Sequence, residues 1–165
     1  MSKAFTKEED GTTDVRLDDL PQSPHPNLVT PSGLADLRDR LAVRRSDLTQ
    51  LKTNPEQIDR KLAIAVAERD IRFLETRIAR AIVVDPLNHP DGIVAFGAEV
   101  DVVTEDDEQL SFWIVGEDQA DPARGHITAH SPLGVALIGA ELGSTVDWQK
   151  PSGSVALEVT AIRFP

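Results

Sequence analysis

GLADLRDRLAVRRSDLTQLKTNPEQIDRKLAIAVAERDIRFLETRIARA, residues 33–81, is the stretch that decides the fold. In its first half, leucines recur at steps of three, four, seven and three residues, at positions Leu34, Leu37, Leu41, Leu48 and Leu51. In its second half, apolar residues recur at steps of three and four, at positions Ile64, Ala67, Ile71, Leu74, Ile78 and Ala81. This is the spacing of coiled-coil seams, so the stretch predicts two helices that pack along their apolar faces.

A turn between the two seams is predicted at Lys52–Asn54. Asn54 precedes a proline, which disfavours the helical conformation, whereas Pro55 suits the first turn of a new helix. Ser32 is the expected N-cap of the first helix. We therefore expect an antiparallel hairpin of helices at about 33–51 and 55–82.

Beyond Val83 the spacing of apolar residues changes from that of helices to that of strands. Short runs with turn residues between them predict strands at 98–104, 109–116, 126–130, 145–149 and 154–163. A proline at the start and a glycine at the end predict a short helix at 132–139. The expected fold class is α+β, a helical hairpin followed by a small antiparallel sheet with one short helix.

Charge divides the chain into the same parts. Residues 1–31 form an acidic, proline-rich tail of net charge −3, which we expect to be mostly disordered. Residues 32–82, the predicted antiparallel coiled coil, carry +3, and residues 83–165, the predicted β-rich domain, carry −11. The positive charge of residues 32–82 belongs either to a solvated helical surface that is rich in arginine or to a surface that contacts a polyanion.

Several kinds of protein are disfavoured by the composition. The chain has no cysteine, which excludes a disulfide framework and thiolate metal sites. No apolar run approaches the roughly 20 residues of a membrane span, and the N-terminus has no signal-peptide core, so we expect a cytoplasmic protein. His126 and His130 would lie about 13 Å apart on one strand, too far for one metal ion, and we expect both at the surface.

Four motifs occur in a specific order along the chain: VTPSGLADLRDRL at 29–41, VVDP at 83–86, IVGEDQAD at 114–121 and SPLGVALIGAELGSTV at 131–146. Together they resemble the Gre-factor family, and the resemblance spans residues 29–165. It implies an antiparallel coiled coil followed by an FKBP-like domain. It also implies a monomeric regulator of transcription elongation, not an enzyme.

The resemblance further implies that the C-terminal domain binds core RNA polymerase at the rim of the secondary channel. The coiled coil would then insert toward the active centre and nascent RNA, where a slender rod with a basic surface is favoured. The basic face comprises Arg38, Arg40, Arg45, Arg60, Lys61, Arg69 and Arg72.

The segment His130-Ser131-Pro132 matches the family segment that docks on the polymerase. His130 departs from the family pattern, which has a small acidic or amide side chain at this position. Ser131 and Pro132 are also residue types that start a helix, and both interpretations can hold.

The tip of the predicted hairpin departs from the family pattern. Family members carry an acidic tip, roughly Gly-Asp-Leu-(Ser/Lys)-Glu-Asn-Ala-Glu-Tyr, that helps to hold the second catalytic Mg²⁺ of the polymerase. This chain reads KTNPEQIDRK at 52–61 and has no tyrosine. Glu56 and Asp59 are the tip carboxylate candidates, three residues apart on one helix face. First-turn acids that complement the helix dipole are the simpler interpretation.

The predicted hairpin is also shorter than that of cleavage factors, in which it resembles the regulators of nucleoside diphosphate kinase. We therefore expect weak or no stimulation of transcript cleavage, no catalytic residue, no metal or cofactor of its own, and at most indirect contact with the polymerase Mg²⁺. One alternative is a fully competent cleavage factor. The other is a peptidyl-prolyl isomerase, which would need an aromatic-lined pocket, and the domain has few aromatic residues: Phe96, Phe112, Trp113, Trp148 and Phe164.

Overall fold

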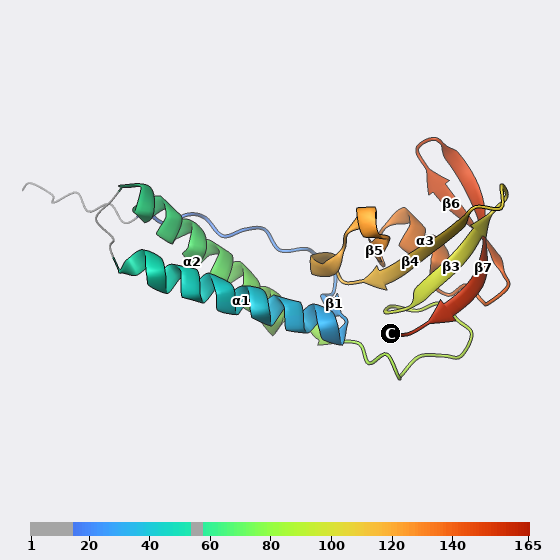
Figure 1. Ribbon diagram of the computed structural model, residues 1–165, viewed down its shortest axis with the longest axis horizontal. Helices are drawn as coiled ribbons and strands as arrows, with labels where there is room; N and C mark the ends of the chain where they lie inside the picture. The colour runs from blue at the N-terminus through green and yellow to red at the C-terminus, as the bar shows by residue number, and fades with distance from the viewer. Residues whose placement is uncertain (1–14, 54–57) are drawn as a thin grey trace, which may run out of the picture.

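A helical hairpin and a β-rich domain make up the computed structural model, which describes residues 15–53 and 58–165 (Figure 1). The hairpin part contains β1 (Leu28–Val29), α1 (Pro31–Lys52), α2 (Ile58–Ala79) and β2 (Ile82–Val83). The β-rich domain contains β3 (Glu99–Thr104), β4 (Gln109–Val115), the 3₁₀ turns η1 (Glu117–Gln119) and η2 (Pro122–Arg124), β5 (His126–Thr128), α3 (Pro132–Leu137), β6 (Thr145–Lys150) and β7 (Gly153–Arg163). The expected α+β architecture is confirmed.

The start of α1 is fixed by Thr30, not by Ser32 as the sequence predicted. The Thr30 backbone is extended, and its Oγ1 accepts a hydrogen bond of 3.0 Å from the backbone N–H of Gly33. Pro31 occupies the first helical position, where its missing N–H costs nothing. Pro31 also favours the extended backbone that an N-cap needs at the preceding residue, and this moves the cap from Ser32 to Thr30.

The two helices pack along the predicted seams. Leu37 and Leu74 are buried together, and the residues that pack around them include Leu34, Leu41, Phe73, Ile78 and Ala81. The second helix ends at Ala79 instead of 82, because residues 82–83 form β2, a short strand that pairs in parallel with β1. Its predicted start at residue 55 lies outside the described residues.

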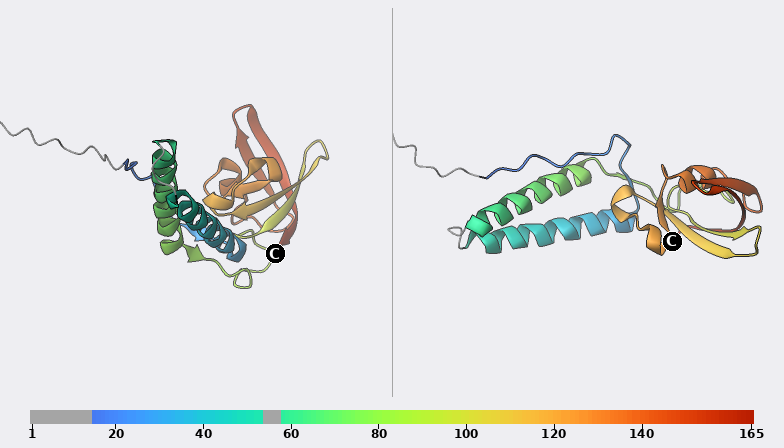
Figure 2. Two further views of the ribbon diagram at one scale, coloured as in Figure 1. Left: turned by 60° about the vertical axis from the view of Figure 1, so that its left-hand side comes forward. Right: turned by 90° about the horizontal axis from the view of Figure 1, so that it is seen from above.

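Residues 15–30, here named the strap, have a defined path, although we expected most of residues 1–31 to be disordered; residues 1–14 lie outside the described residues. The strap runs beside α2 from near the tip of the hairpin to its base, where β1 pairs with β2 (Figures 1 and 2). Asn27, Val29 and Thr30 are buried at that base. The sequence misleads here because a polar, proline-rich segment cannot form its own core, yet it can pack against a core formed by others.

The sheet of the β-rich domain has the order β5-β4-β3-β7-β6. Most neighbours are antiparallel, as predicted, but β5 pairs with β4 in parallel, so the sheet is mixed. The helix α3 packs against β5 and β6. The core is formed by Val94, Ala98, Val100, Val102, Ile114, Ile127, Leu133, Leu137, Ala140, Leu157 and Val159.

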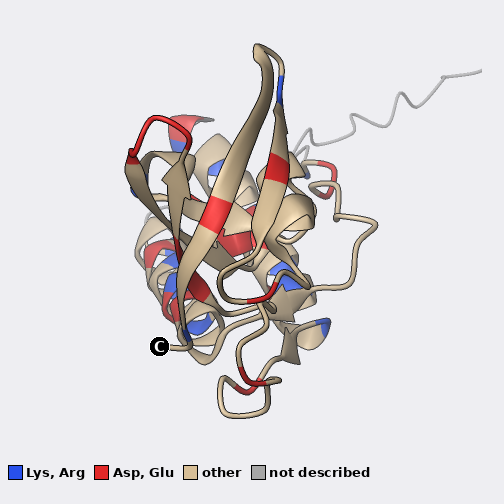
Figure 3. Ribbon diagram, turned by 90° about the vertical axis from the view of Figure 1, so that its right-hand side faces the viewer, with Lys and Arg blue, Asp and Glu red and all other residues tan. Residues whose placement is uncertain are grey.

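The charges follow the division seen in the sequence. Figure 3 views the β-rich domain end-on and shows acidic residues over its strands and turns, with most of the basic residues on the helices behind. The acidic run Glu105–Glu108 forms the exposed turn between β3 and β4. Within the described parts of the chain, the helices are too short or too polar to cross a lipid bilayer.

Candidate functional site

The β5–α3 loop, residues 129–132, contains the predicted docking residues and is held by hydrogen bonds of Ser131. The Ser131 hydroxyl accepts from the backbone N–H of Gly134 at 3.0 Å and donates to the Thr128 carbonyl at 2.8 Å. The Ser131 backbone N–H donates to the Thr128 hydroxyl at 3.1 Å. Pro132 is the first residue of α3. The loop is therefore a fixed corner and presents its side chains in one arrangement.

Gly134 is required by this corner. A Cβ at this position would lie 2.0 Å from the carbonyl oxygen of Thr128, a backbone atom that cannot move away without breaking β5. The order serine, proline, any residue, glycine therefore has a local structural cause. The serine caps the helix, the proline begins it, and the glycine allows α3 to lie against the end of β5.

Apolar side chains extend the exposed surface of the loop. Leu133 and Leu137 of α3 are buried in the core, whereas Val135 and Ile138 are 65% and 39% exposed. Leu142, just beyond the helix, is 56% exposed. This part of the domain thus combines a rigid polar corner with adjacent apolar area, a composition suited to a protein partner.

The two histidines near the loop have different surroundings. His130 is exposed, as predicted, and its ring stacks on that of His25 from the strap, with centroids 3.8 Å apart and an interplanar angle of 16°. His126 is half-buried, because its ring packs edge-on against Trp113 at 5.1 Å. The expectation that His126 is a surface residue is therefore only partly correct.

The IVGEDQAD motif forms the joint between the hairpin and the β-rich domain. Arg77 of α2 has a side chain only 3% exposed. Its Nε and Nη2 each approach Asp118 Oδ2 at 2.7 Å, and Nη2 also lies 3.4 Å from Glu117 Oε2. Hydrogen bonds between ionised groups are the strong ones, so this pair ties the end of α2 to η1.

The strap completes the joint from the other side. Asn27 Nδ2 donates to the Arg77 carbonyl at 2.7 Å, and the Thr30 hydroxyl donates to Gln119 Oε1 at 2.7 Å. The glycine of the motif is needed for this contact, because a Cβ at Gly116 would lie 2.5 Å from the carbonyl oxygen of Leu28. Hairpin, strap and β-rich domain therefore meet in one interlocked region.

Sequence reasoning missed this joint, although one signal for Arg77 was available. Arg77 lies three residues after Leu74, and a helix that buries a wide stripe uses the i+3 position as well as the i+4 position. The consecutive acids of the motif follow a buried strand, which suggests a partner of opposite charge nearby. No local pattern pointed to Asn27, Thr30 or His25, because their partners lie far along the chain.

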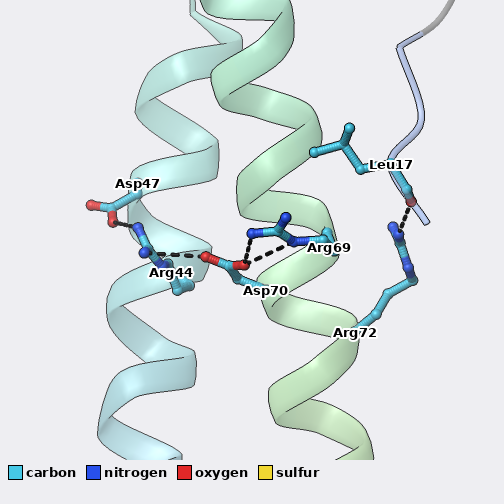
Figure 4. Close-up of polar contacts among 6 residues, drawn as sticks. All are labelled: Leu17, Arg44, Asp47, Arg69, Asp70 and Arg72. Atoms are coloured by element: carbon cyan, nitrogen blue, oxygen red, sulfur yellow. Dashed lines mark hydrogen bonds and ion pairs between the residues drawn. The ribbon is translucent and has the colours of Figure 1, made fainter. Parts of the chain in front are cut away.

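The predicted basic face of the hairpin is partly neutralised. Arg45 pairs with Glu75 at 2.7 Å, and Arg69 pairs with Asp70 at 2.9 Å. Asp70 also forms an ion pair with Arg44 across the helix interface at 3.2 Å. Arg72 donates a hydrogen bond to the carbonyl of Leu17 in the strap, and Figure 4 shows both contacts. The remaining predicted basic residues lie on the surface with exposed or half-buried side chains: Arg38, Arg40, Arg60 and Lys61.

Only one of the two tip carboxylate candidates lies within the described residues. Asp59 is exposed in the first turn of α2, where it complements the helix dipole, and Glu56 lies outside the described residues. Near the tip, the helices are bridged by an exposed ion pair of 2.9 Å between Lys52 and Glu68. Within the described ranges 15–53 and 58–165, no three His, Asp or Glu side chains gather as a metal site would require.

Aromatic residues of the β-rich domain serve packing. Phe112 and Trp148 meet edge-on at 6.0 Å, and both are partly buried against the core. The Lys150 ammonium lies 3.9 Å from the centre of the Trp148 ring, which adds a cation–π contact at the β6–β7 hairpin. Phe164 stacks with His89 of the connector between the two parts.

Comparison with known proteins gives consistent matches. The family described as "Transcription elongation factor, GreA/GreB, C-term" matches residues 89–164. The transcription elongation factor GreA of Rhodospirillum rubrum is 37% identical over 151 residues, covering 82% of this chain and 96% of the relative. GreA of Nautilia profundicola is 40% identical over 119 residues, covering 72% and 74%.

Solved structures were also matched. The crystal structure of GreA factor homolog 1 (Gfh1) from Thermus thermophilus matches with 22% identity and a TM-score of 0.41, covering 84% of this chain and 99% of that one. The GreA/GreB structure from Nitrosomonas europaea matches with 22% identity and a TM-score of 0.42, covering 85% and 99%.

Proposed function

This chain belongs to the GreA/GreB family of transcription elongation factors, and we propose that it binds core RNA polymerase at the rim of the secondary channel without strongly stimulating transcript cleavage. The β-rich domain supplies most of the affinity through His130, Ser131 and Pro132. The hairpin enters the channel as a monomeric rod, with its basic face toward nascent RNA. The observation that carries the proposal is the contrast between a well-built β5–α3 loop and a tip without the acidic pattern of the family.

The β5–α3 loop supports docking because its geometry is already fixed. A rigid corner loses little conformational freedom on binding, so more of its contact energy contributes to affinity. Val135 and Ile138 extend the contact area beside Ser131 without being needed by the core. An interface that combines such apolar area with a few polar groups is typical of protein partners.

The hairpin tip supports weak cleavage for reasons of distance and charge. Direct bonds between Mg²⁺ and oxygen are only about 2.1 Å long, so a carboxylate must be placed very close to the metal. A hairpin shorter by about one heptad per helix loses about 10 Å of reach. Asp59 is followed at once by Arg60 and Lys61, which compete for its charge. Such a protein occupies the channel and excludes cleavage factors.

Transcript cleavage in a backtracked polymerase complex tests the proposal. We expect the native chain to give little cleavage above the factor-free reaction and to inhibit cleavage when a competent Gre factor is added. The double variant Glu56→Ala, Asp59→Ala should behave like the native chain. A matched control is Asp36→Ala, Asp39→Ala, which removes two exposed carboxylates at the other end of the hairpin. Robust cleavage that disappears only with Glu56 and Asp59 would establish a competent cleavage factor instead.

A binding measurement tests the docking surface separately. The double variant Ser131→Ala, Pro132→Ala should weaken polymerase binding by at least about tenfold, since a truncated hot spot costs about 2 kcal/mol or more. The control Pro151→Ala, Ser152→Ala changes the same residue types in the exposed β6–β7 turn.

Because Ser131 also caps α3, a second variant is needed that leaves the cap intact. Val135→Asp alters only the exposed face of α3, so it should weaken binding without lowering stability. Unchanged binding in both variants would place the docking surface elsewhere.

A further inference from the structure

The strap is anchored very unevenly along its length. Its last residues are fixed in the joint, where Asn27 bonds to the Arg77 carbonyl and Val29 is 3% exposed. Leu28 pairs with Ile82 in the β1–β2 ladder. Loss of these contacts would disrupt the base of the hairpin, so this end of the strap is a fixed part of the fold.

Upstream of residue 27, the strap is held by separate surface contacts. Arg72 Nε donates to Asp19 Oδ1 at 2.5 Å, although the Asp19 side chain is 68% exposed. The Ser23 hydroxyl donates to Glu117 Oε1 at 2.8 Å, and His25 stacks on His130. These are single contacts, and an exposed ion pair such as that of Asp19 contributes little by itself.

This part of the strap is rich in proline and has no regular secondary structure. Pro21, Pro24 and Pro26 lack a backbone N–H, and residues 15–27 belong to no helix or strand. Proline also keeps a released chain extended, so reclosing costs less entropy than it would for an ordinary tail. The strap therefore divides at Pro26 into a fixed part and a releasable part.

The releasable part contacts the β5–α3 loop at His130. His25 occupies one face of the His130 ring, and Pro26 lines the same small crevice as Ala129 and His130. Both histidines are exposed, so the core does not require them to stack. His130, which departs from the family pattern, thus has its partner in the strap.

We propose that residues 15–26 form an autoinhibitory lid, hinged at Pro26, that must leave His130 before the β5–α3 loop can dock on RNA polymerase. This inference rests on the proposed function of the loop. In the closed state, His25 takes the place of the polymerase on His130, and Asp19 neutralises Arg72 on the basic face of the hairpin. Apparent affinity is then reduced by the fraction of molecules that are open.

Affinity for core RNA polymerase, measured with full-length variants, tests the lid. The release variant Asp19→Ala, His25→Ala removes two lid contacts and leaves the loop itself unchanged. We expect its binding to tighten by about threefold to tenfold. The matched control Asp18→Ala, His89→Ala removes the same residue types away from the loop, and its binding should stay within about twofold of native. His89 stacks on Phe164, and Asp18 is exposed.

A lock provides the opposite test. In the variant Asp19→Cys, Arg72→Cys of this cysteine-free chain, a short bifunctional thiol reagent with a reducible linker joins the strap to α2 without touching the loop. We expect binding to fall by at least about tenfold when the linker is intact and to recover after reduction. Each protein is thus compared with itself.

The outcomes separate the lid from the function on which it rests. If the native chain binds polymerase but release and lock change affinity by less than about twofold, the lid is wrong and the proposed function stands. Weaker binding after release would show that the strap is a polymerase contact, which also overturns the lid. If no form binds polymerase, the proposed function fails, and the lid fails with it.

Discussion

The two ends of the helical hairpin are held by different kinds of interaction. At the base, the Arg77 side chain is 3% exposed and bonds to two carboxylates, beside the buried pair Leu37 and Leu74. Toward the tip, the helices are bridged by exposed ion pairs, such as the one between Lys52 and Glu68. The base thus fixes how the hairpin leaves the β-rich domain, whereas an exposed ion pair such as the one toward the tip contributes little to stability.

The largest expected difference between the two ends concerns arginine. Arg77→Ala should lower the free energy of unfolding by about 3 kcal/mol or more, because it leaves Asp118 mostly buried without its partner. Arg45→Ala breaks an exposed pair with Glu75 and should cost less than about 1 kcal/mol. Urea denaturation measures both. Arg77→Lys keeps the charge but cannot bond to both acids as arginine does, so its loss of stability should lie between the losses for Arg77→Ala and Arg45→Ala. Equal losses for Arg77→Ala and Arg45→Ala would show that the base has no special role.

Apolar packing should show the same asymmetry with a smaller difference. Leu37→Ala removes a side chain 1% exposed and should destabilise by about 3 kcal/mol, through lost burial and a cavity. Leu51→Ala, at a half-buried seam position near the tip, should cost about 1 kcal/mol, because water already reaches it. Thermal unfolding followed by circular dichroism compares them. If Leu51 is the costlier residue, the tip carries more of the packing than the burial indicates.

The cap of α1 isolates a single contact at the base. Thr30→Ala should cost about 1–2 kcal/mol, since it removes the cap on Gly33 and the bond to Gln119. Thr49→Ala changes the same residue type on the exposed surface of α1 and should be nearly neutral. Chemical denaturation distinguishes the two. A neutral Thr30→Ala would mean that Pro31 alone starts the helix.

The smallest expected effect on stability concerns an exposed ion-pair cluster around Arg163 on the sheet, which serves as a reference outside the hairpin. Arg163 donates to Asp101 at 2.6 and 2.8 Å, and these hydrogen bonds hold the pKa of Asp101 below its ordinary value. A lowered pKa in the folded state adds stability above the unfolded pKa of about 4, and this stability is lost as the pH falls through the folded pKa.

The native chain should therefore be slightly more stable than Asp101→Asn at pH 7, and the difference should shrink in acid. Unfolding curves recorded between pH 7 and about pH 2.5 measure this difference. A difference that does not depend on pH would exclude the charge of Asp101 as its source.

The sequence predicted features that depend on residues close together in the chain, and it missed features that depend on distant ones. The helices, the β-hairpins and the Ser131 corner follow from residues a few positions apart, so the sequence predicted them. The joint depends on contacts such as Thr30 with Gln119 and Arg77 with Asp118, which no local pattern encodes. The same holds for the strap, because its polar composition hides the fact that Val29 is buried in the base of the hairpin.

The contacts at the base also fix the direction in which the helical hairpin points. The helix α1 has 22 residues and is therefore about 33 Å long, so a tilt of about 10° at its root would swing the far end by about 6 Å. A swing of that size exceeds the width of a single amino-acid side chain. Arg77, whose guanidinium bonds to Asp118 of η1 and whose backbone carbonyl accepts from Asn27 of the strap, thus helps to set the position of a hairpin tip that lies far from every residue that aligns it.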